Sequence, residues 1–301
     1  MTPESRTTVP DIAVVMVTYN SVDDIVQALP SLESSLAGWH SRMIVVDNAS
    51  RDGTVAWLQQ WRAQSDDHIL LLNDSNRGYT AAVNQGLLET AHSRWVLFLN
   101  PDVIIPEGAL PALVRCLQQH DRIGVVAPQL RFPDGTIQPS CRRFPHPLDV
   151  FVEPLPVKHL LRWLRYKDWK MSDFDHKSSR LVEQPQGAFL LARRQVLDTV
   201  GGLDERFYMF FSDVDWCFQV YRAGWQIYFC SEAFVYHSKG SSVNRSRLAM
   251  LVTSHRSFAD YFRKHTTGIW AEFGMQVVTF WLLLLLGPRI VFQQLREDGF
   301  L

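Results

Sequence analysis

The chain has 301 residues, enough for one large domain or two small ones with a sizeable core. Thirty Lys and Arg residues oppose 31 Asp and Glu residues, and this near-neutral balance argues against a protein that coats nucleic acid, which needs a basic excess. A hydrophobic content of 47%, with 16 Gly and 15 Pro, excludes wholesale disorder and low-complexity chains. We therefore expect a folded protein that does not bind nucleic acid.

The first 127 residues alternate short apolar runs with helical patterns. Continuous apolar runs predict strands that are buried on both faces, at Ile12–Val17, Met43–Val46, Ile69–Leu72, Trp95–Leu99 and Gly124–Ala127. Helices are predicted between them, at Val22–Ser35, Thr54–Arg62, Thr80–Thr90 and Gly108–His120. This alternation with short connections predicts an α/β fold with a doubly wound, mostly parallel central sheet.

Polar residues follow several of the predicted strands: Thr18-Tyr19-Asn20, Asp47-Asn48, Asn73-Asp74 and Asn100-Pro101-Asp102. In sheets of this kind, ligands bind beyond the carboxyl ends of the strands. The same edge of the sheet is therefore predicted to hold a ligand site.

The rest of the chain begins with a hairpin at Leu130–Gln138 that turns at Asp134-Gly135, followed by an irregular, basic segment at 142–170. Further elements are a strand at Gly187–Arg193, helices at Gln195–Val200 and Val214–Ala223, a strand at Gln226–Phe229 followed by a segment ending at His237, and a helix at Ser246–Lys264.

The ends of the chain and its cysteines indicate the compartment. The first ten residues are polar and lack the apolar stretch of a secretory signal. Four scattered cysteines without a Cys-x-x-Cys pair argue against a zinc cluster or a disulfide framework and favour reduced thiols in the cytoplasm: Cys116, Cys141, Cys217 and Cys230. Residues 277–286 read VVTFWLLLLL, too short a run to span a bilayer, which needs about 20 residues. This tail is expected in the membrane interface or against a partner subunit.

Three acidic residues and one histidine are candidates for chemistry. Asp102 follows a buried strand after Pro101, where a carboxylate can hold Mg²⁺ or Mn²⁺, although Asn-Pro-Asp is also common in turns. Asp213 and Asp215 open a helix beside an aromatic run, so each is a candidate general base or a helix-capping residue. His237 is a candidate metal ligand if the fold places it close to Asp102.

The segment at residues 76–86, NRGYTAAVNQG, begins with a polar turn and continues into a helix with small residues. Gly78 permits close backbone approach, and a helix N-terminus favours an anion, although tight packing of the helix on the sheet would equally require small residues. The phosphate-binding turns of nicotinamide-Rossmann and P-loop proteins are absent from the sequence, as is the nucleophile elbow of α/β-hydrolases.

Eight segments in order over residues 12 to 242 give the chain a family resemblance: VVMVTYNS, VVDNASRDGT, NRGYTAAVNQG, LFLNPDV, RFPDGTIQPSCRRFP, GAFLLARRQVLDTVGGLDERFYMFFSDVDWC, AGWQIYF and VYHSKGSS. The chain resembles the family 2 inverting glycosyltransferases of the GT-A fold, in particular the bacterial branch that includes rhamnosyltransferases. The resemblance implies a Rossmann-like nucleotide-sugar-binding half at about residues 11–127. It also implies an acceptor-binding and catalytic half at 128–242, followed by C-terminal helices in residues 243–301.

The resemblance assigns most of the site. It implies that the nucleotide is bound by the following residues: Thr18, Tyr19, Asn20, Asp47, Gly78, Asn100 and Asp102. Asp102 and His237 would hold a divalent metal, with Asn100 in place of the first acid of the family's D-x-D motif. Asp213 would be the catalytic base, with Ser212 in place of the acid that precedes it in the family. The cleft between donor and acceptor would include Gly187, Ala188 and Asp215.

The activity implied by the resemblance is transfer of a sugar from a nucleotide-diphospho-sugar to a saccharide or a polyprenyl-linked saccharide in cell-surface polysaccharide synthesis. L-Rhamnose from dTDP-rhamnose is the expected donor. Two alternatives stay open. A sugar-1-phosphate nucleotidyltransferase is disfavoured because the loop TYNSVDD is not Gly-rich, and a catalytically degenerate scaffold is supported by Asn100 and Ser212, which replace acids of the family.

An acceptor on a lipid, together with the basic residues before the tail, implies peripheral contact with the inner face of the cytoplasmic membrane. The alternative to membrane contact is that the tail mediates homo-oligomerisation.

Overall fold

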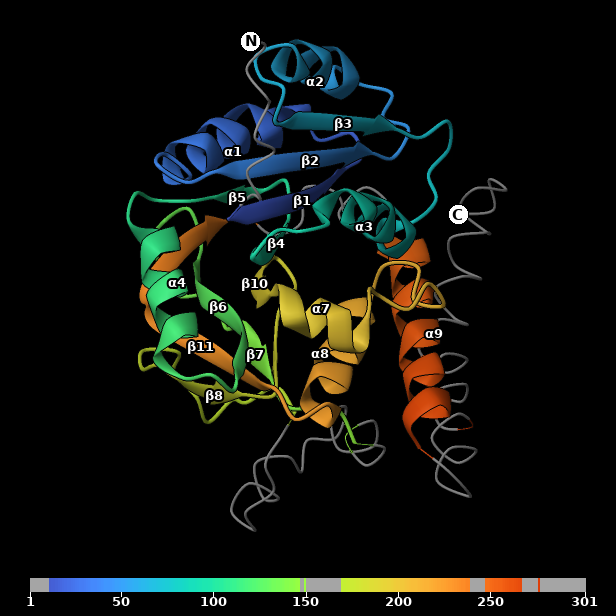
Figure 1. Cartoon of the computed structure of the whole chain (residues 1–301). Coiled ribbons are helices and arrows are strands. Elements are labelled where there is room, and N and C mark those ends of the chain that lie inside the picture. Colours follow the sequence, from blue (N-terminus) through green and yellow to red (C-terminus); the bar gives the residue numbers. More distant parts are fainter. Residues whose placement is uncertain (1–10, 147–148, 150–168, 239–246, 267–275, 277–301) are drawn as a thin grey trace, which may run out of the picture.

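A mixed sheet with helices on both faces forms the centre of the molecule (Figure 1). The computed structural model describes residues 11–146, 149, 169–238, 247–266 and 276. Within them the strand order is β3-β2-β1-β4-β10-β6-β11-β5, with β8 paired to β11. A separate two-stranded ribbon pairs β7 with β9. The predicted α/β class is confirmed.

The first half of the sheet is parallel, as its continuous apolar strands predict. Strand β1 pairs with β2 and β4, and β2 pairs with β3. The elements in this part of the chain are β1 (Ile12–Thr18), α1 (Val22–Ser35), β2 (Ser41–Asp47), α2 (Thr54–Arg62), β3 (His68–Leu72), α3 (Tyr79–Leu87), the 3₁₀ turn η1 (Leu88–Thr90), β4 (Trp95–Leu99), β5 (Val103–Ile104) and α4 (Ala109–Gln119). Of these strands, β5 lies at the other edge of the sheet, antiparallel to β11.

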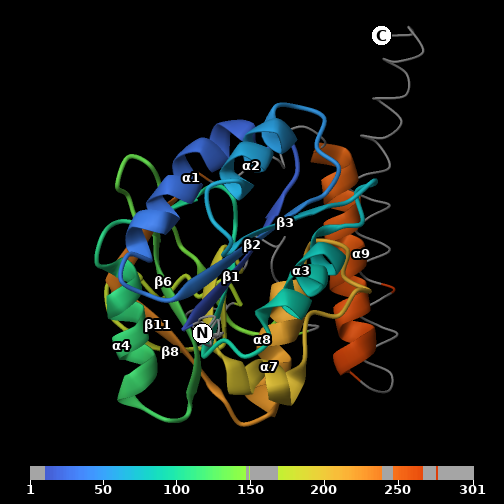
Figure 2. The same ribbon diagram turned by 45° about the horizontal axis from the view of Figure 1, so that its top comes forward.

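Strand β1 shows why the sheet is buried on both faces. Its side chains alternate between the faces, so Ile12 and Val14 pack in one hydrophobic cluster while Ala13 and Val15 pack in another. Helices α1, α2 and α4 contribute to the first cluster, and α3 contributes to the second. Gly86 lets α3 pack tightly, because a Cβ there would lie 2.6 Å from Val15. Figure 2 shows these helices on opposite sides of the sheet.

The second half of the sheet is mixed. Strand β10 runs antiparallel to both β4 and β6, while β11 runs parallel to β6 and antiparallel to β5 and β8. Its elements are β6 (Ile123–Arg131), β7 (Cys141–Arg142), β8 (Arg180–Val182), β9 (Gln184–Pro185), β10 (Phe189–Arg193), α7 (Arg194–Val200), α8 (Ser212–Arg222), β11 (Gln226–His237) and α9 (Arg247–His265). Helices α7 and α8 pack on the same face as α3.

The structure corrects one predicted strand. The sequence pattern divides the segment before His237 into a strand at Gln226–Phe229 and a separate run, but β11 is continuous over Gln226–His237. Its register against β6 shifts between Cys230 and Phe234, and this irregularity breaks the apolar pattern that the prediction follows. One continuous strand therefore contributes residues both to the core and to the candidate site.

Helix α9 packs against α8 through Tyr261 and Phe262, which cluster with Phe207 and Val214. Within the part of the chain that the structure describes, no helix is long and apolar enough to cross a membrane. The apolar tail at 277–286 lies outside the described residues, so its predicted contact with a membrane or a partner chain stays a prediction.

Candidate functional site

Two loops at the carboxyl ends of β1 and β2 are joined by the buried carboxylate of Asp47. Asp47 accepts hydrogen bonds from the Thr18 hydroxyl at 2.9 Å, from the Ser50 hydroxyl at 2.6 Å and from the Ser50 backbone N–H at 2.9 Å. Asn20 ties the same loops together, because its side-chain oxygen accepts the Arg51 N–H at 2.7 Å. Asn20 adopts a positive φ of 50°, strain of a kind that clusters at ligand sites.

Beside these loops lies a pocket of about 460 Å³, lined by Tyr19, Asp47, Ala49, Ser50, Arg51, Val55, Leu72, Asn73, Asp74, Ser75 and Asn76. Tyr19 and Leu72 in this lining are 41% and 47% exposed. An exposed aromatic ring next to convergent polar groups suits a flat heterocycle with hydrogen-bonding edges. Two predicted nucleotide-binding residues, Tyr19 and Asp47, therefore meet in one pocket.

Asn48 organises one wall of this pocket, and sequence reasoning gave it no role. Its side-chain N–H₂ donates to Asn76 Oδ1 at 3.0 Å and to the Gly78 carbonyl at 3.1 Å. Its oxygen accepts from the Asn73 side chain and the Arg77 N–H. The signal was its place beside Asp47 at a strand end.

Gly78 is required by its conformation and its neighbour. Its φ is +89°, and a Cβ there would lie 2.6 Å from the Tyr208 ring. Thr80 binds the same segment, because its hydroxyl donates to the Phe207 carbonyl. Gly78 thus joins the loop after β3 to the aromatic run before α8, and its predicted place beside the nucleotide stays a prediction.

Asp102 and His237 converge where the end of β11 pairs with β5, the last strand in the order of the sheet. His237 Nε2 lies 3.5 Å from Asp102 Oδ1, and the two side chains are 3% and 11% exposed. Strand pairing brings them together, because His237 on β11 is registered with Val103 on β5. On the other side of the ring, His237 Nδ1 lies 2.7 Å from Gln138 Oε1.

Asn100 is linked through its backbone to Ala188, one of the residues predicted to line the cleft. Its N–H donates to the Ala188 carbonyl at 2.9 Å. The adjacent Gly187 N–H donates to Asp213 Oδ2 at 2.9 Å. One short stretch of backbone therefore connects the Asn-Pro-Asp turn with the candidate base.

The Asp213 carboxylate is partly buried at the start of α8. Burial raises the pKa of Asp213, while the backbone N–H groups of Gly187 and Val214 and the charge of Arg142 act in the opposite direction. Gly187 cannot carry a side chain without displacing Asp213, because a Cβ would lie 2.9 Å from Asp213 Cβ. A half-buried carboxylate with a raised pKa is suited to accept a proton.

Asp215 lies in a different environment from Asp213. It is fully buried, with Oδ2 2.8 Å from Lys264 Nζ and Oδ1 2.6 Å from His265 Nε2. The Gln219 side chain donates to it as well, at 2.8 Å. These bonds join α8 to α9, and the predicted place of Asp215 in the cleft stays a prediction.

His176 and Gln138 were missed by sequence reasoning. His176 Nε2 accepts the backbone N–H groups of Ser140 at 3.2 Å and Cys141 at 3.0 Å, and Nδ1 lies 3.0 Å from the Phe174 carbonyl. This buried ring thereby fixes the loop from which Gln138 reaches His237. The Ser140 carbonyl also accepts the Gln186 N–H at 2.8 Å. No local pattern marks either residue.

The sequence profile of the family described as "Glycosyl transferase family 2" matches residues 13–178. The chain belongs to this family. It is 30% identical over 271 residues to the N-acetylglucosaminyl-diphospho-decaprenol L-rhamnosyltransferase of Mycobacterium tuberculosis, and the match covers 85% of each chain.

Solved glycosyltransferase structures resemble this family 2 chain in fold. The mannosyltransferase PcManGT from Pyrobaculum calidifontis, in complex with GDP-Man and Mn²⁺, superposes with a TM-score of 0.57 at 16% identity, covering 92% of this chain and 75% of the other. TarS 1–349 from S. aureus gives a TM-score of 0.53 at 16% identity, covering 89% and 69%. The predicted GT-A fold is confirmed.

Proposed function

We propose that this chain transfers a sugar from a nucleotide-diphospho-sugar to a polyprenyl-linked saccharide, with inversion at the anomeric carbon, in cell-surface polysaccharide synthesis. L-Rhamnose from dTDP-rhamnose is the proposed donor, supported by the name of the relative from M. tuberculosis. The observation that carries the proposal is the convergence of Asp102 and His237 from two distant segments of the chain.

The residues at this place fit a divalent cation. With Gln138 oriented so that its oxygen faces His237 Nδ1, that nitrogen carries the proton and Nε2 presents a lone pair to the Asp102 carboxylate. Two acceptors then face each other at 3.5 Å, an arrangement that a shared cation stabilises. Asp102 and His237 are the proposed ligands, and Mn²⁺ in the Pyrobaculum structure supports a metal of the same kind.

When bound there, Mg²⁺ or Mn²⁺ supplies positive charge beside the diphosphate leaving group. The residues of this chain perform the remaining tasks. Asp213 accepts the proton of the acceptor hydroxyl as its oxygen attacks the anomeric carbon from the face opposite the diphosphate. A single displacement of this kind inverts the anomeric centre and needs no covalent enzyme intermediate.

The pocket beside Asp47 is the proposed nucleotide-base site. The Tyr19 ring would stack on the base, and the loops held by Asp47 and Asn48 would bind its edge and the ribose. A carboxylate offers about four acceptor positions, so Asp47 can accept a ligand N–H in addition to its three internal bonds. Thr18 and Asn20 then act chiefly by fixing these loops.

A polyprenyl-linked acceptor would place the reaction at a membrane surface. We propose that the protein acts in the cytoplasm as a peripheral protein on the inner face of the cytoplasmic membrane. The exposed Arg256 and Arg263 on α9 support this location, because cationic side chains attract anionic headgroups. Sedimentation with anionic vesicles tests this proposal, and absence of binding would contradict it.

The proposed reaction is tested with the Asp213→Asn variant. The purified chain is incubated with dTDP-rhamnose, Mn²⁺ and a polyprenyl-diphospho-N-acetylglucosamine acceptor, and product is measured by mass spectrometry. Loss of a general base predicts a rate decrease of about 10²–10⁴-fold with nucleotide binding retained. Asp198→Asn is the matched control, because Asp198 forms only a surface pair with Arg194.

Retention of the wild-type rate by Asp213→Asn would show that another group acts as the base. If the wild type binds the nucleotide but transfers no sugar from dTDP-, UDP- or GDP-sugars, the chain is a degenerate binding protein. A different preferred donor would revise the sugar and leave the reaction class intact.

A further inference from the structure

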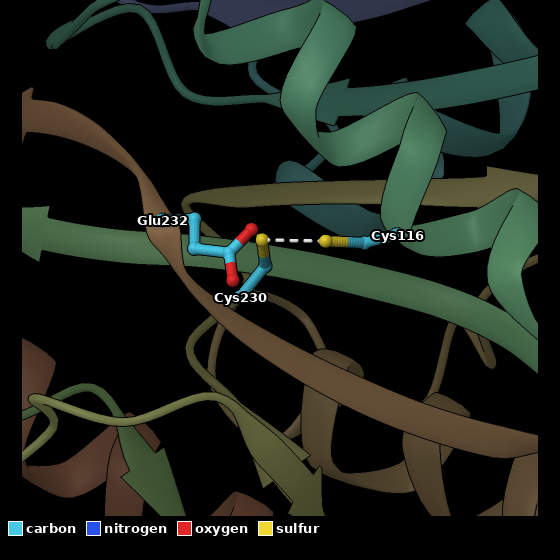
Figure 3. Close-up of side chains that lie close together, drawn as sticks. All are labelled: Cys116, Cys230 and Glu232. Atoms are coloured by element: carbon cyan, nitrogen blue, oxygen red, sulfur yellow. Dashed lines mark hydrogen bonds between the residues drawn. The ribbon is translucent and has the colours of Figure 1, made fainter.

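Two buried cysteines face each other across the core, on the side of the sheet covered by α4. Cys116 on α4 and Cys230 on β11 are 3% and 0% exposed, and their Sγ atoms are 2.6 Å apart (Figure 3). They are separated by 114 positions in the sequence, so the fold alone brings them together. The glycosyl-transfer reaction uses neither of them.

The distance between the sulfurs decides between two chemistries. Two thiolates bound to one tetrahedral zinc ion, each about 2.3 Å from it, would lie about 3.8 Å apart. A disulfide brings them to about 2.05 Å, much closer to the observed separation. The third group nearby is Glu232, which has a carboxylate oxygen within 4.8 Å of both sulfurs (Figure 3). Glu232 is exposed, and these three residues supply one ligand fewer than a closed zinc site requires.

The surroundings of Cys230 favour its thiolate. The hydrogen bond with Cys116 lowers the pKa of Cys230, and the backbone N–H groups of Ala233 and Glu232 act in the same direction, against burial and the charge of Glu232, which raise it. These N–H groups lie in the part of β11 where the register against β6 shifts, after Cys230. The pKa of Cys116 is raised by the same hydrogen bond. The backbone N–H groups beside Cys230 favour this sulfur as the nucleophile, and the geometry places the Cys116 sulfur 2.6 Å from it.

The other two cysteines provide an internal comparison. Cys141 and Cys217 are also fully buried, and burial raises the pKa of each, that of Cys141 to about 12. Burial alone therefore does not activate a thiol in this protein.

We propose that Cys116 and Cys230 are a redox-active pair that a peroxide converts to a disulfide between α4 and β11. The Cys230 thiolate attacks one oxygen of hydrogen peroxide, the O–O bond breaks, and a sulfenic acid and hydroxide form. The Cys116 sulfur then attacks the sulfenic sulfur as its proton is lost, the S–S bond forms, and hydroxide leaves. The two released protons convert the hydroxides to water, so two thiols are oxidised and one peroxide is reduced to two waters. A dithiol reductant reverses the bond by exchange.

The disulfide would connect a helix that follows the segment of Asp102 with the strand that carries His237, the two proposed metal ligands. Helix α4 follows the Asn-Pro-Asp turn closely, and β11 ends at His237. A covalent link between them restricts the unfolded chain across a long loop and holds both segments together in the folded state. We therefore expect the oxidised protein to resist urea better than the reduced protein.

The experiment uses the full chain, reduced and then freed of reductant. One portion receives hydrogen peroxide at one equivalent, and free thiols in both portions are alkylated after denaturation and located by peptide mass spectrometry. The expected result is loss of alkylation at Cys116 and Cys230, with Cys141 and Cys217 still alkylated. A peptide cross-linked between Cys116 and Cys230 should appear, and dithiothreitol should remove it. Urea midpoints before and after oxidation are compared with those of Cys230→Ser, which should not respond.

Three results would overturn the proposal. Equal alkylation of all four cysteines after peroxide would show that the pair is not reactive. Sulfinic acid at Cys230 without a cross-link would show that Cys116 does not reach it during the reaction. Zinc that copurifies with the untreated protein, and a chelator requirement for alkylation of the pair, would identify a metal site instead.

Discussion

In residues 11–127 the candidate site residues follow strands that are buried on both faces, whereas in residues 128–238 their side chains form hydrogen bonds with distant segments. Thr18 and Asp47 occupy registered positions at the ends of two parallel strands, so the sheet itself brings them together. His237 is also placed by strand pairing, but its ring contacts Gln138, whose loop is held by His176. A regular sheet fixes the first group collectively. The second group is sensitive to individual side chains, and mutations there should change activity more than they change the fold.

The largest expected effect in this comparison comes from Gly187→Ala. The new Cβ would lie 2.9 Å from Asp213 Cβ and 3.1 Å from Oδ2, so the base must move. A displacement of a catalytic group by about 1 Å costs about 10²-fold in rate, and we expect a loss of this order in kcat with nucleotide affinity unchanged. Steady-state transfer kinetics and nucleotide titration measure the two quantities.

Gly53→Ala is the matched control for this change. A Cβ at Gly53 meets its nearest neighbour, Val22, at an ordinary 3.5 Å. Gly53 precedes α2, so a small loss of stability is expected and no loss of transfer. An unchanged kcat in Gly187→Ala would contradict the close coupling of Gly187 to the base.

The next effect concerns a contact that joins the two regions. The Asn84 side chain on α3 accepts the Leu203 N–H at 2.8 Å and donates to the Leu203 carbonyl at 2.8 Å. Asn84→Ala leaves both backbone groups without these partners, which should lower the free energy of unfolding by about 1–3 kcal/mol. Urea denaturation measures the change. Gln85→Ala on the same helix should cost less, because Gln85 Oε1 has no hydrogen-bond partner among the described residues.

A smaller effect is expected on the pH profile of transfer. The charge of Arg142 lowers the pKa of Asp213 against the larger, raising effect of burial. Arg142→Gln should therefore raise the pKa of Asp213 and move the acid limb of kcat to higher pH, since the base acts only when ionised. Arg143→Gln is the control, because Arg143 forms a bidentate pair with Asp173. Equal pH profiles of kcat for the two variants would show that Arg142 does not lower the pKa of Asp213.

The smallest expected effect is a pH dependence of stability. Burial lowers the pKa of His176 below its ordinary 6.5, so the unfolded chain binds the proton more tightly than the folded one. Charged groups near the ring act in both directions: Arg142 lowers the pKa and Asp175 raises it. The stabilising contribution of neutral His176 is complete above pH 6.5 and is lost as the pH falls below that value.

Urea denaturation at several pH values tests this contribution. His176→Gln keeps an acceptor for the backbone N–H groups but does not titrate, so its stability should fall less than that of the wild type between about pH 7.5 and about pH 5, a range that includes the ordinary His pKa. His176→Phe lacks an acceptor and should be less stable than the Gln variant at each pH. Parallel pH curves for the wild type and His176→Gln would contradict the neutral state of the ring.

The sequence predicts the two regions to different extents for physical reasons. The continuous apolar runs of β1 to β4 are local signals, and so are the polar residues after them, which led to Asp47 and Asp102. The antiparallel placement of β10 between β4 and β6 is not a local property, because the same apolar residues suit either direction.

The site residues show the same limit. Asp102 and His237 were each noted from sequence, but only strand pairing brings them to 3.5 Å. Gln138 and His176 were not predicted, and Asn48 was noted only as a polar residue at a strand end, because hydrogen bonds over 28 to 99 residues leave no pattern in the segments that make them. The family resemblance identified the candidate site residues. The contacts that hold these residues in place could be identified only from the structure.

The central claim is that both regions contribute to one metal-dependent nucleotide site, Asp47 and Asp102 from the first and His237 from the second. Isothermal titration calorimetry of dTDP, UDP, GDP and ADP with Mn²⁺, and then with a chelator, tests it most directly. The account predicts selective binding of dTDP that weakens on chelation and weakens equally in Asp102→Ala and His237→Ala. Binding of a nucleotide that neither the chelator nor His237→Ala affects would contradict the shared site.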